Sequence, residues 1–504
     1  MVLRPQEILS EAEIARGLRM GIGDGLASEA MTTLTGGAFL VALALLLGAS
    51  NFEIGLLAAM PTLTNVFQLL SIWLVRRYSN RRMISIVCSI LARLPLAVLG
   101  YLVLTFPHQA SVQVLIFFLF FYYFFGSVSG PVWNSWMKDL IPTQSLGAYF
   151  SKRSGYMQSL NVIFSIALAV ILDDIKRNHP GSLLSTYGIM FAAAGTVGLI
   201  GMILLSRVPE PRPVMSRENI FTLFKQPLQD KNFRQLLVFI SVWVFAINIA
   251  TPFFTVFMLT TLGLSLSYVI GLGILSQVTS ILTIRLWGKF ADRYSNKTII
   301  GIGAPLYILC IVAWCFVGLF NFYGNFTLLV LIQIFSGIAT SGINLSLTNI
   351  GLKLAPQEDA IVYLSVKNVI SAVFASISPL IGGYLADYFT SRHFGITIEW
   401  SGPHASSIIH LIALHQWNFL FLIGALLAFL SLQFLGRVKE AGEVEKDTVV
   451  RILRSAVRSN LKEYFLIGNL ITFQEFLSSK IRHGGERIRR PLDGRSKKPS
   501  RNAD

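Results

Sequence analysis

The chain consists of apolar runs, each long enough to cross a lipid bilayer, joined by short polar turns. A spanning helix needs about 20 mostly apolar residues, and inside the bilayer only helices or closed barrels satisfy every backbone polar group. The sequence therefore predicts an all-α integral membrane protein. Twelve such runs lie at about 21–47, 53–75, 83–105, 111–134, 154–172, 184–206, 235–259, 266–288, 298–320, 326–349, 362–386 and 416–436.

Composition supports this class. Hydrophobic residues make up 53% of the chain and charged residues only 13%, and the mean hydropathy is +0.62. Charged residues make up about 25% of soluble domains. The net charge of +16 does not indicate a nucleic-acid partner, because basic loops in a membrane protein report its orientation first. Residues 1–20 have mixed charge and no apolar core, so we expect no cleavable signal peptide there.

The basic residues fall almost entirely on one side of the predicted topology. Of the 42 Lys and Arg residues, those in loops on the other side are Lys176, Arg177 and Arg392, and Arg93 lies inside an apolar run. Positive loops stay in the cytoplasm. We therefore expect a multi-pass protein of the inner (plasma) membrane, with both termini in the cytoplasm.

The chain contains an internal duplication. The basic turn at 76–82 recurs at 292–297, with Tyr78 and Tyr294 lying 216 residues apart. Two six-helix bundles related by a pseudo-two-fold axis along the membrane normal are predicted, with a binding site between them. The expected organisation is a cytosolic stub at 1–20, a first bundle at 21–206, a Pro-rich cytosolic linker at 207–234, a second bundle at 235–437 and a basic cytosolic tail at 438–504.

Three motifs resemble those of the major facilitator superfamily of secondary transporters. The run from Gly288 to Lys297 is similar to the loop signature between the second and third helix of a half. The run from Trp136 to Pro142 resembles the turn after the fourth helix, and Pro379 to Asp387 resembles the eleventh helix. The resemblance implies the twelve-helix fold of that superfamily and transport by alternating access.

The resemblance also implies a cytoplasmic gate. In the second half the matching residues include Asp292, a carboxylate expected to latch the helix ends. In the first half Ile72 stands in place of the glycine and Arg76 in place of the acid, so only two arginines carry over there. The expected gate residues are Arg77, Arg81, Asp139, Gly288, Asp292 and Arg293.

Ionisable residues inside the membrane are costly and usually functional. Glu29 and Arg93 lie at comparable depths and are candidate partners. Glu29 either has a function, in proton coupling or substrate contact, or forms a purely structural salt bridge to Arg93. Asp24 lies nearer the expected start of its span and is interpreted as a solvated carboxylate at a helix start.

Polar residues at mid-depth mark the expected substrate and coupling path. Any single amide inside the membrane can instead make a hydrogen bond that packs two helices together. Only the whole group of polar residues therefore indicates a cavity. The expected path residues are Glu29, Thr33, Asn65, Gln68, Arg93, Asn248, Gln277, Gln333 and Asn344.

We expect no metal site and no cofactor. His393, His404, His410 and His415 fit no usual ligand spacing, and no phosphate-binding loop or nucleophile motif is present. Arg451, Arg454, Arg458 and Lys462 recur at helical spacing in the tail and predict a basic amphipathic helix on anionic lipid.

These patterns favour a monomeric, proton-coupled secondary transporter of a small solute. One alternative is a uniporter or facilitator, and another is a drug or metabolite exporter, although the fifth span lacks the Gly- and Pro-rich signature of drug-proton antiporters. A transporter-like sensor signalling through its tail is an alternative of another class. A membrane enzyme would need His and acidic residues gathered at one interface, and the short turns supply none.

Overall fold

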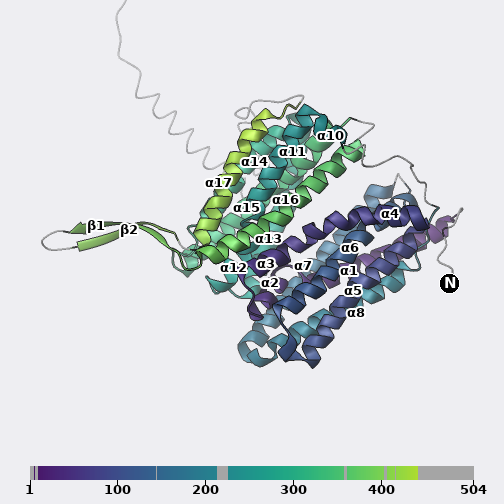
Figure 1. The fold of residues 1–504 in the computed structure, drawn as a ribbon, viewed down its shortest axis with the longest axis horizontal. Helices are drawn as coiled ribbons and strands as arrows, with labels where there is room; N and C mark the ends of the chain where they lie inside the picture. Colours follow the sequence, from purple (N-terminus) through teal and green to yellow (C-terminus); the bar gives the residue numbers. More distant parts are fainter. Residues whose placement is uncertain are drawn as a thin grey trace, which may run out of the picture. The chain divides into compact units, whose positions relative to one another are not determined.

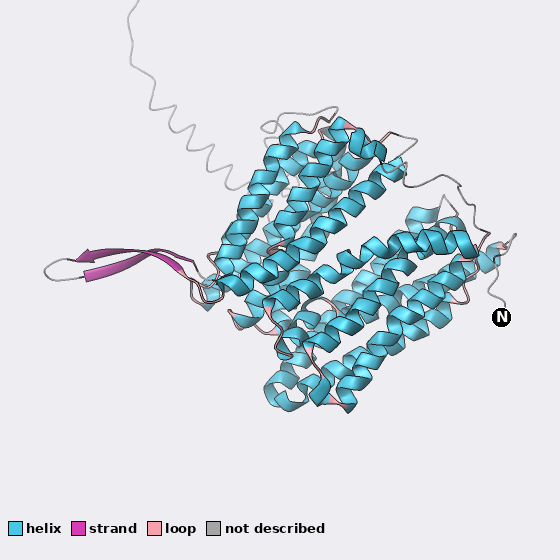
Figure 2. Cartoon of the chain, viewed as in Figure 1, coloured by secondary structure: helices cyan, strands magenta, loops and turns pink. Residues whose placement is uncertain are grey.

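The computed structural model describes residues 5, 9–142, 145–212, 225–356, 360–401, 406–414 and 416–440. They belong to one compact unit, residues 1–443. The described part consists of helices and one β-hairpin (Figure 2). The amphipathic helix and lipid contact predicted for the tail lie outside the described residues.

Among the described residues, each half of the chain supplies six candidate membrane spans, and together they make the 12 that the sequence predicts. The all-α, twelve-span prediction is thereby confirmed. Figure 1 shows the helices of the first half in purple to teal and those of the second in teal to yellow-green. The first half contains α1 (Glu11–Thr35), α2 (Gly37–Leu46), α3 (Asn51–Thr64), η1 (Asn65–Phe67), α4 (Gln68–Tyr78), α5 (Arg81–Thr105), η2 (Pro107–Gln109), α6 (Val112–Leu140), α7 (Leu146–Asn178), η4 (Pro180–Ser182) and α8 (Leu183–Leu205).

The second half follows the same order of spans. A short helix, α10, precedes its first span, which is the seventh of the chain. That span is broken between α11 and α12, just before Pro252, because proline has no backbone N–H to continue the helix. The elements are α10 (Lys225–Gln229), α11 (Lys231–Asn248), α12 (Thr251–Thr260), α13 (Leu266–Arg293), α14 (Asn296–Trp314), α15 (Phe322–Leu354), α16 (Ala360–Phe389), β1 (Phe394–Ser401), β2 (Ser406–Leu414) and α17 (Gln416–Arg437).

The first span begins at Glu11, not at residue 21 as the apolar pattern predicted. Ser10 and Glu13 form a capping box, in which each side chain accepts the backbone N–H of the other. The polar first turns of α1 therefore form a helix although they are not apolar. The break between α1 and α2 falls at Gly36 and Gly37, and Gly37 has a φ of +56°, which favours glycine.

A two-stranded antiparallel hairpin connects α16 to α17, and the sequence analysis assigned no structure to this segment. Residues Phe394–Ser401 pair with Ser406–Leu414, with a register shift after Ile396. The strands are rich in β-branched residues, which favour extended backbone. The hairpin contains most of the histidine-bearing segment.

The spans run alternately in opposite directions, so the start of α1 and the end of α17 lie on the same membrane side. We call this the terminal side and the other the opposite side. The two ends of α3 illustrate the definition, because it begins at the opposite side with Asn51 and continues through α4 to Tyr78 at the terminal side.

Candidate functional site

A cavity of about 430 Å³ is lined by residues of both halves. Ala38, Asn161 and Ser165 of the first half face it, and α12, α13, α14 and α15 of the second half supply the rest of its wall. Two residues of the predicted path, Gln277 and Gln333, line it. The cavity therefore occupies the place between the halves where the duplication predicted a binding site. We call it the central cavity.

One wall of the central cavity is aromatic. Phe254 of α12 stacks on Trp314 of α14, with ring centroids 4.5 Å apart and planes 9° from parallel. Tyr307 of α14 lines the same cavity and is buried. The rings supply flat apolar surface beside the amide and hydroxyl groups of α13 and α15.

Asn161 connects the central cavity to the polar face of α1. Its side-chain amide donates a hydrogen bond of 2.9 Å to the hydroxyl of Thr33, and its side chain also lies within interaction range of the carboxylate of Glu29. Thr33 in turn donates to the backbone carbonyl of Glu29 at 2.8 Å. Glu29 is half-buried, one side chain away from the cavity that Asn161 lines. Sequence reasoning selected Glu29 and Thr33 but missed Asn161.

A second cavity of about 440 Å³ lies within the first half, lined by residues of α1, α3, η1, α5, α6, α7 and α8. We call it the first-half cavity. Arg93 and Asn65 from the predicted path line it, together with Asp24, Arg153 and Tyr122. The guanidinium of Arg153 also lies over the ring of Trp133, 4.6 Å from its centroid.

The candidate pairing of Glu29 with Arg93 is wrong, because the carboxylate that pairs with Arg93 is that of Asp24. The two side chains approach to 3.3 Å, and only 4% of Asp24 and 6% of Arg93 is exposed. Arg93 also donates to the carbonyl of Gly198 at 2.5 Å and to the hydroxyl of Ser28 at 2.8 Å. The interpretation of Asp24 as a solvated carboxylate is therefore also wrong, because its side chain is buried.

The error arose from the start of the first helix. Because α1 begins at Glu11, Asp24 is between about three and four turns into the helix, not in its first turns. Asp24 and Ser28 are four residues apart and share the face that meets Arg93. That spacing was the sequence signal that could have identified Asp24.

Three predicted path residues lie elsewhere. Asn248 donates its side-chain amide to the carbonyl of Val244 on its own helix at 2.8 Å, and Asn344 is exposed. Gln68 begins α4 and is half-buried. None of the three lines either cavity. The hydrogen bond of Asn248 therefore stays within α11, which is neither the path role nor the helix-packing role that the sequence analysis offered.

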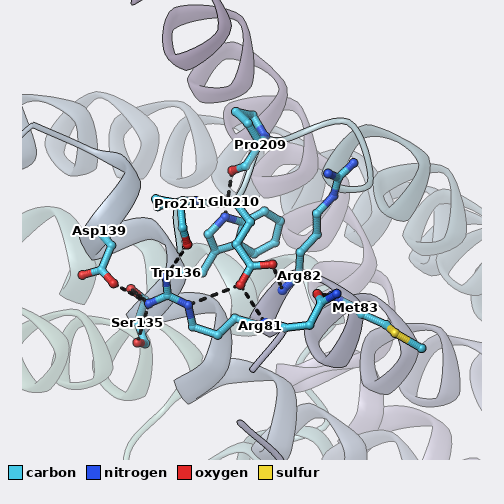
Figure 3. A network of polar contacts seen from close by, with 10 residues as sticks. Arg81, Arg82, Met83, Ser135, Trp136, Asp139, Pro209, Glu210 and Pro211 are labelled. Carbon is cyan, nitrogen blue, oxygen red and sulfur yellow. Dashed lines mark hydrogen bonds and ion pairs between the residues drawn. The ribbon is translucent and has the colours of Figure 1, made fainter. Parts of the chain in front are cut away.

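Arg81 is the centre of a polar network at the terminal side, shown in Figure 3. Its guanidinium pairs with Asp139 at 2.5 Å and lies 3.5 Å from Glu210. Only 2% of Arg81 is exposed and none of Glu210, so this is a buried pair. The carboxylate of Glu210 also accepts the backbone N–H groups of Arg81 and Arg82, at 2.7 and 3.1 Å, and so caps the start of α5.

Trp136 completes this network by donating its indole N–H to the carbonyl of Pro209 at 2.9 Å (Figure 3). The structure thus brings together Arg81 and Asp139, two of the expected gate residues. Glu210 was missed, although a lone acid between Pro209 and Pro211 at the end of the sixth span was a visible signal. It supplies a carboxylate to a turn that has Arg76 where the resemblance expected an acid.

Glu440 occupies the corresponding place in the second half, after the twelfth span. It accepts the backbone N–H groups of Asn296 and Lys297 at 3.2 and 2.8 Å, which caps the start of α14. It also pairs with Lys353 at 3.2 Å. Burial raises the pKa of Glu440, but the hydrogen bonds from Lys297 and Asn296 outweigh it and hold the pKa below the usual range. For Glu210 burial outweighs its hydrogen bonds and raises the pKa.

The other expected gate residues contribute less to these networks. Arg77 is exposed, and Arg293 is exposed beside the ring of Tyr294, 5.6 Å from its centroid. An added Cβ at Gly288 would meet only Leu345 at 4.0 Å, so no close packing requires glycine there. The side chain of Asp292 lies outside the described part of the chain, and its latch stays a prediction.

At the opposite side two acids cap helices of the other half. The carboxylate of Asp173, near the end of α7, accepts the N–H groups of Leu266 and Ser267 at 2.9 and 2.8 Å. The carboxylate of Asp387, near the end of α16, accepts the N–H groups of Asn51 and Phe52 at 3.1 and 2.9 Å. The side-chain amide of Asn51 adds a third bond to Asp387, of 2.8 Å.

Close helix packing accompanies these caps. An added Cβ at Gly383 of α16 would collide with the backbone of Asn51 and Phe52, and one at Gly55 of α3 would collide with the carbonyl of Pro379. Gly382 faces its own half, against the carbonyl of Ile249. The glycine pair of the eleventh-helix motif therefore lets α16 approach one helix in each half.

Within the residues that the structure describes, no three His, Cys, Asp or Glu side chains are grouped closely enough to hold a metal ion.

Comparison with known proteins gives one family and one fold. The family model of the Major Facilitator Superfamily matches residues 25–323 and 238–479. No curated protein sequence matches the chain. A crystal structure of a mutant of the nucleoside transporter NupG has a TM-score of 0.61 at 14% identity, over 85% of this chain and all (100%) of that chain.

Two further structures give similar results. A POT family transporter in complex with 5-aminolevulinic acid has a TM-score of 0.58 at 12% identity, over 87% of this chain and 99% of that chain. A bacterial homologue of the human lysosomal transporter Spinster, inward-facing and unoccupied, has a TM-score of 0.53 at 16% identity, over 76% of this chain and 84% of that chain. At these identities the likeness shows the fold.

Proposed function

The chain belongs to the Major Facilitator Superfamily, and on that premise we propose that this membrane transporter couples solute movement to protons at Glu29. The solute binds in the central cavity, and both termini face the cytoplasm from the plasma membrane. The proposed transport domains are the two predicted bundles, 21–206 and 235–437. The terminal side is then the cytoplasmic side.

The observation that carries this proposal is the position of Asn161. It lines the central cavity and its side chain interacts with Glu29, so a change of charge at Glu29 acts on a group of the cavity wall. Asp24 is a poorer candidate for the coupling proton, because it forms a buried ion pair with Arg93 at 3.3 Å and its protonation would leave that cation without a counter-charge. We therefore assign the coupling proton to Glu29 and a fixed structural role to the Asp24 and Arg93 pair.

Alternating access is supported by the helix caps of the opposite side. Asp173 and Asp387 each join one half to the other, and the binding cavity lies between the same halves. Opening that side requires these bonds to break, while the halves rock around the central cavity. The caps then close the path to the outside while the cavity takes or releases solute inside.

The test measures proton movement in reconstituted vesicles. Proteoliposomes loaded with the pH dye pyranine receive a panel of uridine, nicotinamide and phenyl glucoside with the charged counterparts uridine monophosphate, nicotinate and phenyl glucuronide. We expect at least one solute to change the internal pH with the parent protein. The Glu29→Gln variant should abolish that change while still exchanging radiolabelled solute, because Gln keeps the shape but carries no proton.

A matched control is Glu53→Gln, since Glu53 belongs to the capping box of α3 at the opposite side. It should keep the proton signal. Solute exchange by the parent with no proton signal would reject coupling and leave a facilitator. A normal proton signal from Glu29→Gln would reject Glu29 as the coupling residue.

Thermal stability separates the roles of the two acids. Glu29→Gln should unfold at nearly the same temperature as the parent, because within the described residues Glu29 forms no ion pair and Arg153 acts on it only at longer range. Asp24→Asn should lose about 3–5 kcal/mol, because it leaves the buried Arg93 unmatched. The double variant Asp24→Asn with Arg93→Met should regain much of that loss.

A further inference from the structure

The central cavity presents no charged side chain to its contents. Its wall contains no Asp, Glu, Lys, Arg or His among the residues that the structure describes. The carboxylate of Glu29 interacts with Asn161 but does not line the cavity. An ion transferred from water into such a wall would lose hydration without a counter-charge, which costs several kcal/mol. The wall therefore selects against charged solutes.

Two amide side chains in the cavity have hydrogen-bonding groups to spare. For Gln277 of α13 and Gln333 of α15 no side-chain hydrogen bond is found within the described part of the chain, although both are half-buried. By contrast, the hydroxyl of Thr251 donates to the carbonyl of Ile247 in α11 at 2.9 Å, and that of Thr340 donates to the carbonyl of Ser336 in its own helix at 2.7 Å. Each carboxamide offers both donors and an acceptor, so a bound solute needs groups of both kinds.

The aromatic wall defines the rest of the solute. The ring of Phe254 is held parallel to that of Trp314, which itself is buried, so the pair is a fixed surface and not a mobile side chain. A flat ring can stack on such a surface, whereas a bulky branched aliphatic group would contact it over less area. The volume of about 430 Å³ lies within the range of pockets for small molecules.

We infer that the central cavity binds an uncharged solute with one flat ring, whose polar edge exchanges hydrogen bonds with Gln277 and Gln333. This inference depends on the proposed function only for the choice of cavity. It names the substrate class that the proposal left open. Binding to the purified protein tests it without any proton gradient.

The experiment is a thermal-shift titration of the purified full-length chain with the same matched panel. At least one of uridine, nicotinamide and phenyl glucoside should raise the unfolding midpoint, and its charged counterpart at equal concentration should not. The charged counterparts differ by one phosphate or carboxylate, so they probe the charge and keep the ring. A charged compound that stabilises as well as its neutral partner would overturn the inference, and so would a panel in which no neutral compound stabilises.

Variants then locate the site. Gln277→Leu and Gln333→Leu should each weaken binding of the stabilising compound about tenfold, the loss expected for one hydrogen-bonding side chain. Asn178→Leu is the control, because Asn178 is an exposed amide at the end of α7 that bonds Asp174. Unchanged affinity in both Gln variants would refute the assigned contacts. Binding without any proton signal in vesicles would reject proton coupling and leave this inference standing.

Discussion

The two membrane sides use acidic helix caps differently. At the terminal side, Glu210 caps α5 and Glu440 caps α14, and each acid follows directly after the last span of the half whose helix it caps. At the opposite side, Asp173 caps α13 and Asp387 caps α3, and each acid belongs to the other half. The chemistry is the same, a carboxylate accepting N–H groups of a first helical turn.

The difference is one of connectivity and has consequences for motion. A cap within a half moves with that half as a rigid body and stabilises it in every conformation. A cap between halves exists only while the two halves are close at that side. The first kind is therefore expected to set stability, and the second kind to set which side is open.

The largest effect is expected from glycines at the two kinds of helix contact. Gly55→Ala would drive a Cβ into the carbonyl of Pro379 across the halves, whereas Gly100→Ala would drive one into the backbone of Ala192 within the first half. Both variants should unfold at a lower temperature. Only Gly55→Ala should open the opposite side, since overpacking costs about 1–3 kcal/mol and about 1.4 kcal/mol changes a population tenfold.

The readout is labelling of Thr251→Cys, a residue of the central cavity, by an impermeant maleimide added from outside to a background without Cys88, Cys310 and Cys315. Gly55→Ala should raise the labelling rate about tenfold. An equal increase with Gly100→Ala would mean that the two contacts do not differ as the comparison requires.

A smaller, several-fold increase in the same labelling is expected from Asp173→Asn combined with Asp387→Asn. Each Asn keeps one acceptor oxygen and loses the charge that favours a helix N-terminus, so a remnant of each cap persists. Asp174→Asn is the control, because Asp174 bonds Asn178 on its own helix. Of the single variants, Asp173→Asn should be the more destabilising, as α13 has no side-chain cap of its own whereas α3 retains that of Ser50.

The smallest effect concerns pH and the two caps of the terminal side. The pKa of Glu440 is held below 4.5, so its stabilising contribution is present above about pH 4.5 and is lost as the pH falls through its folded-state pKa. The pKa of Glu210 is raised above 4.5, so its contribution is present below that pH and is lost as the pH rises through its folded-state pKa.

In a thermal scan series from pH 7 to pH 4, Glu440→Gln should therefore lose part of the acid sensitivity of the parent, by about one or two degrees. Glu210→Gln should not become less acid-sensitive. Identical pH profiles for the two variants would show that the caps titrate alike and that the contrast in their burial and bonding has no effect on stability.

The sequence predicted those features of this protein that can be read from neighbouring residues along the chain. The twelve spans, the duplication and the family follow from apolar runs and repeated turns. Among the candidate site residues, Gln277 and Gln333 line the central cavity and Arg81 pairs with Asp139, and their polarity inside or beside apolar runs is visible in any window. Sequence reasoning missed Asn161 and Glu210, because each matters through a partner far away in the sequence.

The sequence by itself determined which segments lie in the membrane and which lie in water, because runs of about 20 apolar residues are typical of helices that cross a bilayer. Only the tertiary structure decided which charges meet. Asp24 was assigned to Arg93 and Glu29 to Asn161 by which face of α1 each occupies and by where that helix begins. The physical reason is range: hydropathy acts residue by residue along a span, whereas an ion pair requires two atoms from different helices within about 4 Å, and packing alone sets that distance.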